Sequence, residues 1–298
     1  MTRLLLTGAT GTIGRRLVRT LTAQGHRPAV LLHHPERAAV LGPDRPHVTP
    51  VLGDYEDRAG LLAALDGVDH LFLLCPNVPE QVGYENAVID AAAACGVARI
   101  VKISAHGAAP DSPVAFWRWH ADIEQHLLDS GIDSVVLRPR FSMANVLGHA
   151  AGVREHGVLF TPHADAPLAM VDPQDVADVA AHLLTAESLP AHRHLDVSGP
   201  SGVTFTDLAA VLTEVSRRPV IHRGGTDDEA REYLEQHGTP PFVTDQLLAI
   251  FAALRAGAQA APSHTVLDLL GHAARPVTAF LAEHADAFRQ PALTEDAS

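Results

Sequence analysis

His120 and Glu124 are the residues whose types and spacing best suit proton transfer. They lie four residues apart in the helical pattern of residues 117–128, and this spacing puts both side chains on one face of a helix. An imidazole can donate or accept a proton near neutral pH, and a neighbouring carboxylate can orient the ring. The same spacing also occurs in solvated pairs that only stabilise a helix. The sequence leaves both interpretations open.

A glycine-rich turn near the N-terminus has the spacing of a pyrophosphate site. Gly8, Gly11 and Gly14 follow the apolar run at residues 4–6, and apolar residues then recur at helical spacing. Gly8 permits a tight turn, Gly11 lets the backbone approach the pyrophosphate, and Gly14 lets the helix pack closely on the strand. Free N–H groups at the helix start face the phosphates. If the turn binds a nucleotide, the expected cofactor contacts are Gly8, Thr10, Gly11, Thr12, Ile13 and Gly14. The alternative is an ordinary strand-to-helix turn that binds no nucleotide.

The elements that must position these groups alternate between strands and helices in the first half of the chain. This alternation predicts an α/β fold with a Rossmann-type, doubly wound, mostly parallel sheet. Ligands of such a sheet bind at the carboxyl ends of its strands. Strands are expected at 4–6, 29–32, 47–51, 70–74, 99–104 and 133–137, and helices at 61–65, 85–94 and 117–128.

The second half of the chain has a less regular pattern. It predicts helices at 173–184 and 206–215, the latter capped by Thr204 or Thr206, and a strand at 194–197. A helical segment at 224–261 is expected to form a lid over the strand ends. We expect an NAD(P)-binding domain at residues 1–150 and a smaller C-terminal α/β substrate-binding part at 151–298, interleaved with the core.

The composition narrows the class of protein. The 298-residue chain is 47% hydrophobic and carries a net charge of −13 without a cluster of Lys and Arg, which argues against nucleic-acid binding. The 19 histidines are scattered and form no metal-ligand array. Two cysteines, no signal peptide and no apolar membrane span favour a cytoplasmic protein without a disulfide framework. We expect a monomer or homodimer that acts on a small molecule.

The end of the second predicted strand bears on the choice of cofactor. In NAD-specific sites an acidic residue here binds the ribose 2′-hydroxyl. This chain has His33, His34 and Arg37 instead, which suit a 2′-phosphate as charge-assisted donors. NADP is therefore favoured over NAD, although these can also be plain surface residues. Further cofactor contacts are expected at strand ends: Asp54, which can accept a hydrogen bond from the adenine amino group, and Leu74, Cys75 and Pro76.

Short motifs over nearly the whole chain carry a family resemblance. They are residues 7–14, 52–54, 86–92, 101–104, 120–124, 130–132, 137–145 and 171–177. In order and spacing they resemble the atypical short-chain dehydrogenase/reductases, specifically the NmrA-like branch that includes type 2 quinone oxidoreductases. The resemblance implies the dinucleotide-binding fold. It implies less about the reaction, because members reduce quinones or other small molecules, sense NADP, or act without net redox chemistry.

The sequence departs from the wider superfamily at the proton relay. No tyrosine is followed by lysine four residues later, and Lys102 is the only lysine. Strand alternation predicts that Lys102 points away from the side chains of Val101 and Ile103. The resemblance places His120 at the acid–base helix, with Glu124 one turn on. It places Ser104 where the superfamily has its substrate-orienting serine, although a hydroxyl there can also bind the cofactor amide or cap the loop.

The resemblance also marks the edge of the nicotinamide and the substrate cavity. Arg138 and Pro139 end the last strand of the first half, and this segment in the family borders the nicotinamide. Phe116, Trp117 and Trp119 lie beside His120 in the sequence. At least one of them is expected in the core, and the sequence does not decide which of them line the pocket. Candidate substrate contacts are Trp117, Phe141, Met143 and Asn145.

These features lead to one main expectation and two alternatives. The first is an NADPH-dependent reductase of a small, conjugated, largely apolar acceptor of the quinone or enone type, which needs no Tyr/Lys relay because its reduced form is stabilised. The second is a redox-neutral isomerase or cyclase of secondary metabolism. The third is a non-catalytic regulator that senses NADP.

Overall fold

The computed structural model describes residues 2–162 and 165–290, and the chain divides into two compact units. The first unit comprises Met1–Arg140, Pro173–Val197 and Ser263–Ala273. The second comprises Phe141–Asp172, Ser198–Pro262 and Ala274–Ser298. Two segments from beyond residue 150 thus belong to the same unit as the glycine turn.

The first unit is built on a seven-stranded parallel sheet, so the predicted α/β fold class is confirmed. The strand order β3-β2-β1-β4-β5-β6-β8 reverses direction of winding after β1, as in doubly wound sheets. Short apolar runs form these strands because both faces of the sheet are covered by helices. The strands are β1 (Leu4–Leu6), β2 (Ala29–Leu32), β3 (Thr49–Leu52), β4 (His70–Leu73), β5 (Arg99–Ile103), β6 (Asp133–Pro139) and β8 (His194–Val197).

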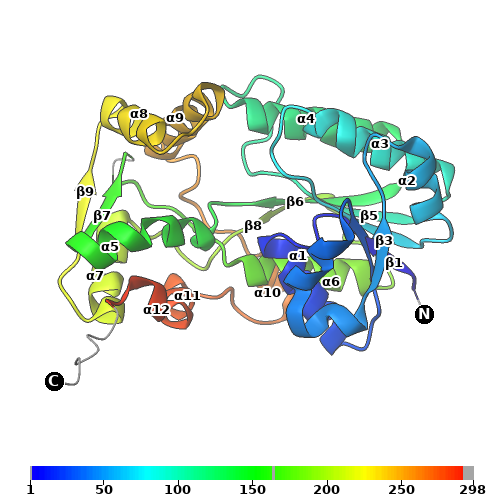
Figure 1. The fold of residues 1–298 in the computed structure, drawn as a ribbon, viewed down its shortest axis with the longest axis horizontal. Helices are drawn as coiled ribbons and strands as arrows, with labels where there is room; N and C mark the ends of the chain where they lie inside the picture. The colour runs from blue at the N-terminus through cyan, green and yellow to red at the C-terminus, as the bar shows by residue number, and fades with distance from the viewer. Residues whose placement is uncertain (1, 163–164, 291–298) are drawn as a thin grey trace. The chain divides into compact units, whose positions relative to one another are not determined.

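Helices cover the two faces of this sheet (Figure 1). One face carries α1 (Thr12–Ala23) and α6 (Pro173–Thr185), which pack against each other, and α10 (Thr265–Leu270) packs on α6. The other face carries α2 (Arg58–Leu65), α3 (Gln81–Ala94) and α4 (Ala115–Asp129). The 3-10 segment η1 (Pro35–His47) follows β2. The main apolar core beneath α2–α4 includes Leu71, Ile89, Ile100 and Ile123.

Local sequence signals fix several helix ends in the first unit. Gly96 and Gly131 follow α3 and α4 with φ of +71° and +72°, the left-handed conformation expected of residues that end helices. Arg99 lies buried in β5, where its guanidinium donates to the carbonyl oxygens of Leu183 and Ala186 at 2.8 and 2.7 Å. It thereby satisfies carbonyl groups at the C-terminal end of α6.

The second unit has its own small sheet and core. Strands β7 (Val158–Thr161) and β9 (Ile221–Gly224) pair in parallel, and the sequence patterns had indicated neither. The predicted cap of α7 is confirmed at Thr204, whose side chain forms a capping box with Asp207. Segment 224–261 is helical as predicted. The helices are α5 (Ala150–His156), α7 (Phe205–Ser216), α8 (Asp227–Gln236), α9 (Pro241–Arg255), α11 (Val277–Glu283) and α12 (Ala285–Phe288), with the 3-10 segment η2 (Met143–His149).

No helix within residues 2–162 and 165–290 is both long and apolar enough to cross a membrane.

Candidate functional site

The glycine turn leaves backbone N–H groups available at the start of α1. Gly11 is the N-cap residue of this helix, and its N–H donates to the Gly8 carbonyl oxygen at 3.0 Å. Within the described structure, no side chain caps α1. The N–H groups of its first turn are therefore free to receive an anion, which the positive end of the helix dipole also attracts.

Two glycines in this turn occupy positions that side chains would block. Gly8 has φ of +62°, and a Cβ atom there would lie 2.7 Å from the Leu74 carbonyl oxygen. A Cβ atom on Gly14 would overlap the Gly8 carbonyl oxygen. The turn thus brings bare backbone to the helix start, which is the cradle that a dinucleotide pyrophosphate requires. The residues present fit NAD(P)H.

The end of β4 lies beside this cradle and is tied to β1 through Thr7. The Thr7 hydroxyl accepts a hydrogen bond from the Leu74 N–H at 2.8 Å and donates to the Leu74 carbonyl at 3.0 Å. Cys75 follows and is buried, and burial, with a smaller contribution from Glu85, raises the pKa of its thiol to about 12. Cys75 therefore offers an apolar thiol and not a nucleophile. Pro76, the next expected contact, is exposed.

The tips of β2 and β3 bring His33 and Asp54 together. His33 Nδ1 lies 3.4 Å from Asp54 Oδ2, and the rings of His33 and His34 are 4.3 Å apart. His34 Nδ1 is 3.9 Å from Glu36 Oε1, and Arg37 is exposed in the first turn of η1. Two of the basic groups expected to hold a 2′-phosphate, His33 and His34, thus lie side by side, and each has a carboxylate close by.

Ser104, Glu124 and Arg138 form one hydrogen-bonded cluster at the carboxyl ends of β5 and β6. Ser104 Oγ donates to Glu124 Oε1 at 2.5 Å. Arg138 Nε donates to the same oxygen at 3.1 Å, and Arg138 Nη2 pairs with Glu124 Oε2. His194 Nε2 lies 3.4 Å from Glu124 Oε2. Glu124 is only 8% exposed, so its charge is neutralised by Arg138 in a largely dry setting. Pro139 follows Arg138 at the end of β6.

His120 has a different partner from the one expected. The sequence interpretation had Glu124 orienting the His120 ring, whereas the structure gives Glu124 to Ser104 and Arg138. The His120 Nδ1 atom instead lies 3.5 Å from Lys102 Nζ. The helical spacing does put both residues on one face, but the guanidinium and hydroxyl from the neighbouring strands bind the carboxylate more strongly than a neutral ring can.

The surroundings of His120 disfavour the protonated form of its ring. Burial, then the positive charges of Lys102 and Arg138, hold the pKa of His120 well below its ordinary value of 6.5. The ring is therefore neutral at pH 7. A neutral ring can still donate one hydrogen bond and accept another.

The only lysine of the chain lies at the centre of a buried polar network. Lys102 Nζ donates to Glu85 Oε2 at 2.6 Å and to the Ile103 carbonyl at 3.0 Å. The side chains of Lys102 and Glu85 are at most 1% exposed. Glu85 Oε1 in turn accepts from Gln81 Nε2 at 2.9 Å. The strand alternation predicted the face that Lys102 uses, since Lys102 and Ser104 both contact α4. It did not reveal the partners.

Glu85 and Gln81 are functional candidates that the sequence analysis missed. A signal was present in the sequence, because both polar residues fall at the helical spacing of the apolar residues Val88 and Ala92, and the structure buries all four. Polar groups at such positions require partners from other elements.

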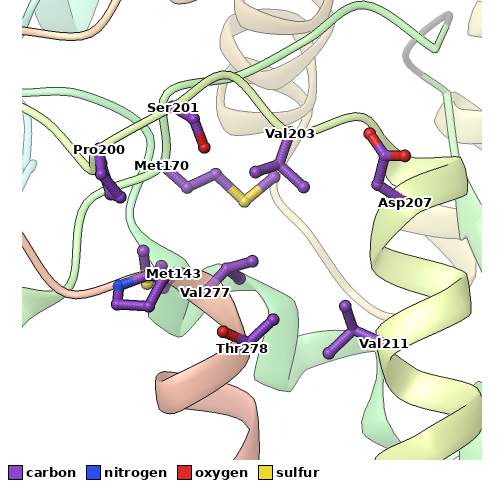
Figure 2. A pocket seen from close by; sticks show the side chains of 10 residues that line it. Met143, Met170, Pro200, Ser201, Val203, Asp207, Val211, Val277 and Thr278 are labelled. Carbon is purple, nitrogen blue, oxygen red and sulfur yellow. The ribbon is translucent and has the colours of Figure 1, made fainter.

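The candidate substrate contacts fall in both units. Trp117 is buried in α4, against Gly107, whose φ of +104° and missing side chain make room for the indole. In the second unit Phe141 is half-buried and Asn145 is exposed. Met143 is buried and lines a cavity of about 240 Å³, together with Met170 and Val211 (Figure 2). The walls of this cavity are mostly apolar, with Asp207, Ser201 and Thr278 as its polar side chains.

Comparisons with known proteins bear on the cofactor and the reaction. A family model described as NAD(P)H-binding matches residues 8–187. The chain is 39% identical over 286 residues to (4-alkanoyl-5-oxo-2,5-dihydrofuran-3-yl)methyl phosphate reductase of Streptomyces griseus, covering 96% of this chain and 99% of that protein. It is 33% identical to an NAD(P)H azoreductase of Xenophilus azovorans, covering 96% and 99%. The Escherichia coli NADPH-dependent quinone oxidoreductase QOR2, solved with NADPH, superimposes with a TM-score of 0.84 at 28% identity, covering 95% of this chain and 98% of that one.

Proposed function

The chain belongs to the NAD(P)H-binding family, and from this premise we propose that it is an NADPH-dependent reductase of a small, conjugated, largely apolar acceptor of the quinone or enone type. It is an NAD(P)H-dependent oxidoreductase: its family is NAD(P)H-binding, and its relatives are named as a reductase, an NAD(P)H azoreductase and a quinone oxidoreductase. The bound nicotinamide supplies the hydride. The protein's own residues hold the cofactor and orient and polarise the acceptor.

The observation that carries the choice of acceptor is the pairing of charged groups at the ends of β5 and β6. Arg138 is paired with Glu124, Lys102 is paired with Glu85, and His120 is neutral. These groups can donate hydrogen bonds, but they are poorly suited to deliver a proton. A conjugated acceptor matches this chemistry, because the negative charge formed by hydride addition is delocalised and needs only hydrogen-bond donors. Water can then protonate the product.

The names of the relatives support the same acceptor class. They specify an oxo-dihydrofuran, an azo compound and a quinone, each a conjugated system that accepts two electrons. Among the first unit's residues we retain His120, Ser104 and Glu124 as candidate active-site groups and Trp117 as a candidate substrate contact. Met143, Phe141 and Asn145 stay proposed contacts in the second unit.

The proposed preference for NADPH rests on the cluster of His33, His34 and Arg37. The 2′-phosphate adds two negative charges near neutral pH, and a guanidinium with two imidazoles can bind it through charge-assisted hydrogen bonds. The carboxylates of Asp54 and Glu36 lie beside His33 and His34 and reduce the net positive charge there. The preference is therefore expected to depend most on Arg37, which is always charged.

The test is a titration of the purified protein with NADPH, followed by absorbance of the reduced nicotinamide on addition of a quinone, an unsaturated lactone or an azo dye. Protein-dependent oxidation of NADPH with one of these acceptors supports the proposal. Binding of NADPH without oxidation by any of them would contradict it, and would favour the redox-neutral or sensing alternatives. The same titration with NADH measures the cofactor preference.

A further inference from the structure

We propose that Lys102 is a positioning residue that holds His120 in the tautomer protonated at Nε2, so that His120 can give a neutral N–H hydrogen bond to the acceptor oxygen. This inference rests on the proposed reductase function for the role of the ring. The tautomer itself is a property of the protein alone and can be measured without cofactor or substrate.

The hydrogen bonds of Lys102 carry the inference. A lysine ammonium has three N–H donors and no acceptor. In this structure Nζ has three acceptors within reach, which are Glu85 Oε2 at 2.6 Å, the Ile103 carbonyl at 3.0 Å and His120 Nδ1 at 3.5 Å. A proton on Nδ1 would face the ammonium at this distance. Nδ1 is therefore the acceptor, and the single proton of the neutral ring is on Nε2.

The buried Lys102 side chain has a buried carboxylate as its partner. Lys102 Nζ lies 2.6 Å from Glu85 Oε2, so the two side chains form a charge-assisted hydrogen bond. The second oxygen of Glu85 is occupied by Gln81 Nε2 at 2.9 Å, which fixes the carboxylate. In this series of contacts Gln81 donates to Glu85, and Lys102 donates both to Glu85 and to His120 Nδ1. The hydrogen bonds thus connect α3 through β5 to α4.

The charges that act on His120 all oppose a second proton on its ring. Lys102 and Arg138 both oppose a positive ring, and His120 is only 5% exposed. Glu124, the nearby carboxylate on the same helix, is bound by Arg138 and Ser104. The ring consequently stays a neutral donor over the physiological pH range.

The chemical consequence is polarisation without proton transfer. As hydride adds to the acceptor carbon, the π-electron pair moves to the conjugated oxygen, which becomes an enolate or phenolate. An Nε2–H hydrogen bond stabilises that charge, and water supplies the proton that completes the two-electron reduction. Removal of one such donor typically lowers kcat by about 10²-fold.

The first test is ¹⁵N NMR of the histidine rings in the wild-type protein at pH 7, without ligand. The His120 signal is assigned by its loss in His120→Gln. His126→Gln, at a half-buried position of the same helix, is the matched control for spectral changes. The expected result is a protonated Nε2 and an unprotonated Nδ1. A protonated Nδ1, or an imidazolium, would overturn the proposal.

The second test replaces the ion pair as a pair, with Lys102→Met and Glu85→Gln together, because Lys102→Met alone leaves a buried carboxylate without a partner. In the folded double variant we expect Nδ1 protonation to appear in the spectrum. We also expect kcat to fall toward the ~10²-fold loss of His120→Ala, with KM for NADPH unchanged. An unchanged tautomer and unchanged kcat in the double variant would show that Lys102 only supports the fold. If the wild-type tautomer is as expected but no acceptor is reduced, the positioning holds and the reductase function fails.

Discussion

Arg138 and Glu124 form a two-point ion pair, with Nε on Oε1 at 3.1 Å and Nη2 on Oε2. The carboxylate is almost fully buried, whereas the guanidinium is about a quarter exposed. Because of this difference in burial, the two single substitutions should differ in their cost to the stability of the fold. Loss of the arginine leaves a buried charge, while loss of the glutamate leaves a cation that water can reach.

We predict from this pair that Arg138→Met destabilises the protein by about 3 kcal/mol, the low end of the range for breaking a buried ion pair. The double variant Arg138→Met, Glu124→Gln should recover most of that loss, because it leaves no uncompensated charge. Urea denaturation of both variants measures the difference. Equal stability of the single and double variants would mean that the pair is not coupled.

The glycine cradle leads to a prediction about cofactor binding. Gly14→Ala should sharply weaken NADPH binding and lower stability, because its Cβ atom would overlap the Gly8 carbonyl oxygen. Gly83→Ala is the matched control, since a Cβ atom there meets nothing within 4 Å in α3. It should leave binding unchanged and raise stability by up to about 1 kcal/mol. Isothermal titration with NADPH and thermal unfolding test both variants. Wild-type affinity in Gly14→Ala would place the cofactor elsewhere.

The cluster at the end of β2 predicts the cofactor preference. Arg37→Ala should raise KM for NADPH roughly tenfold, the equivalent of one charge-assisted hydrogen bond, and should leave KM for NADH unchanged. Arg19→Ala, on the exposed face of α1 beside Asp44, is the control. Steady-state kinetics with both cofactors separate the effects. A parallel rise for NADH would show that Arg37 does not recognise the 2′-phosphate.

One buried histidine, His120, and two partly buried ones, His149 and His222, predict how stability depends on pH. Burial lowers the pKa of His120, His149 and His222 below the ordinary 6.5. In the unfolded chain these rings take up protons as pH falls through 6.5, while in the folded protein they resist protonation. The unfolded state then binds more protons, so stability is full above pH 6.5 and declines as pH falls below it.

Urea midpoints between pH 8 and pH 5 measure this decline. His120→Asn should flatten the curve by removing one of the three contributors. A midpoint that stays constant or rises below pH 6.5 in the wild-type protein would contradict the lowered pKa of these three rings.

The two cysteines should differ in reactivity. The Cys75 thiol is buried with a pKa near 12, so the thiolate is negligible at pH 8, whereas Cys95 is partly exposed at the end of α3. Iodoacetamide should therefore modify Cys95 first and leave Cys75 intact in the native protein. Peptide mass spectrometry gives the order. Early loss of Cys75 would indicate that the end of β4 opens to solvent.

The sequence predicted those features that depend on local periodicity. Apolar runs and glycine stops located the strands of the large sheet and most helices around it, although η1 and α10 were not predicted. The glycine turn lies at the end of β1 as expected. The pairing of β7 with β9 could not be predicted from the sequence. The two strands are far apart in the chain, and neither shows a clear alternation of apolar and polar residues. The segment 194–197 was recognised as a strand, but only the fold shows that it pairs with β6.

For the candidate site, residue types were easier to predict than partners. His120, Ser104, Glu124 and Arg138 were identified individually, and three of them form one cluster. The expected pairing of His120 with Glu124 was wrong because helical spacing considers one helix only. The arginine from β6 and the lysine from β5 decide the hydrogen bonds, and their contacts with α4 follow from tertiary packing.

The most direct measurement of the central claim is transfer of deuterium from NADPH labelled at nicotinamide C4 to an unsaturated lactone, with the product analysed by mass spectrometry and NMR. The proposed reductase places one deuterium on the acceptor carbon conjugated to the carbonyl, with one NADP⁺ formed per product. Product formation without deuterium and with unchanged cofactor would contradict hydride transfer and identify the chain as a redox-neutral catalyst.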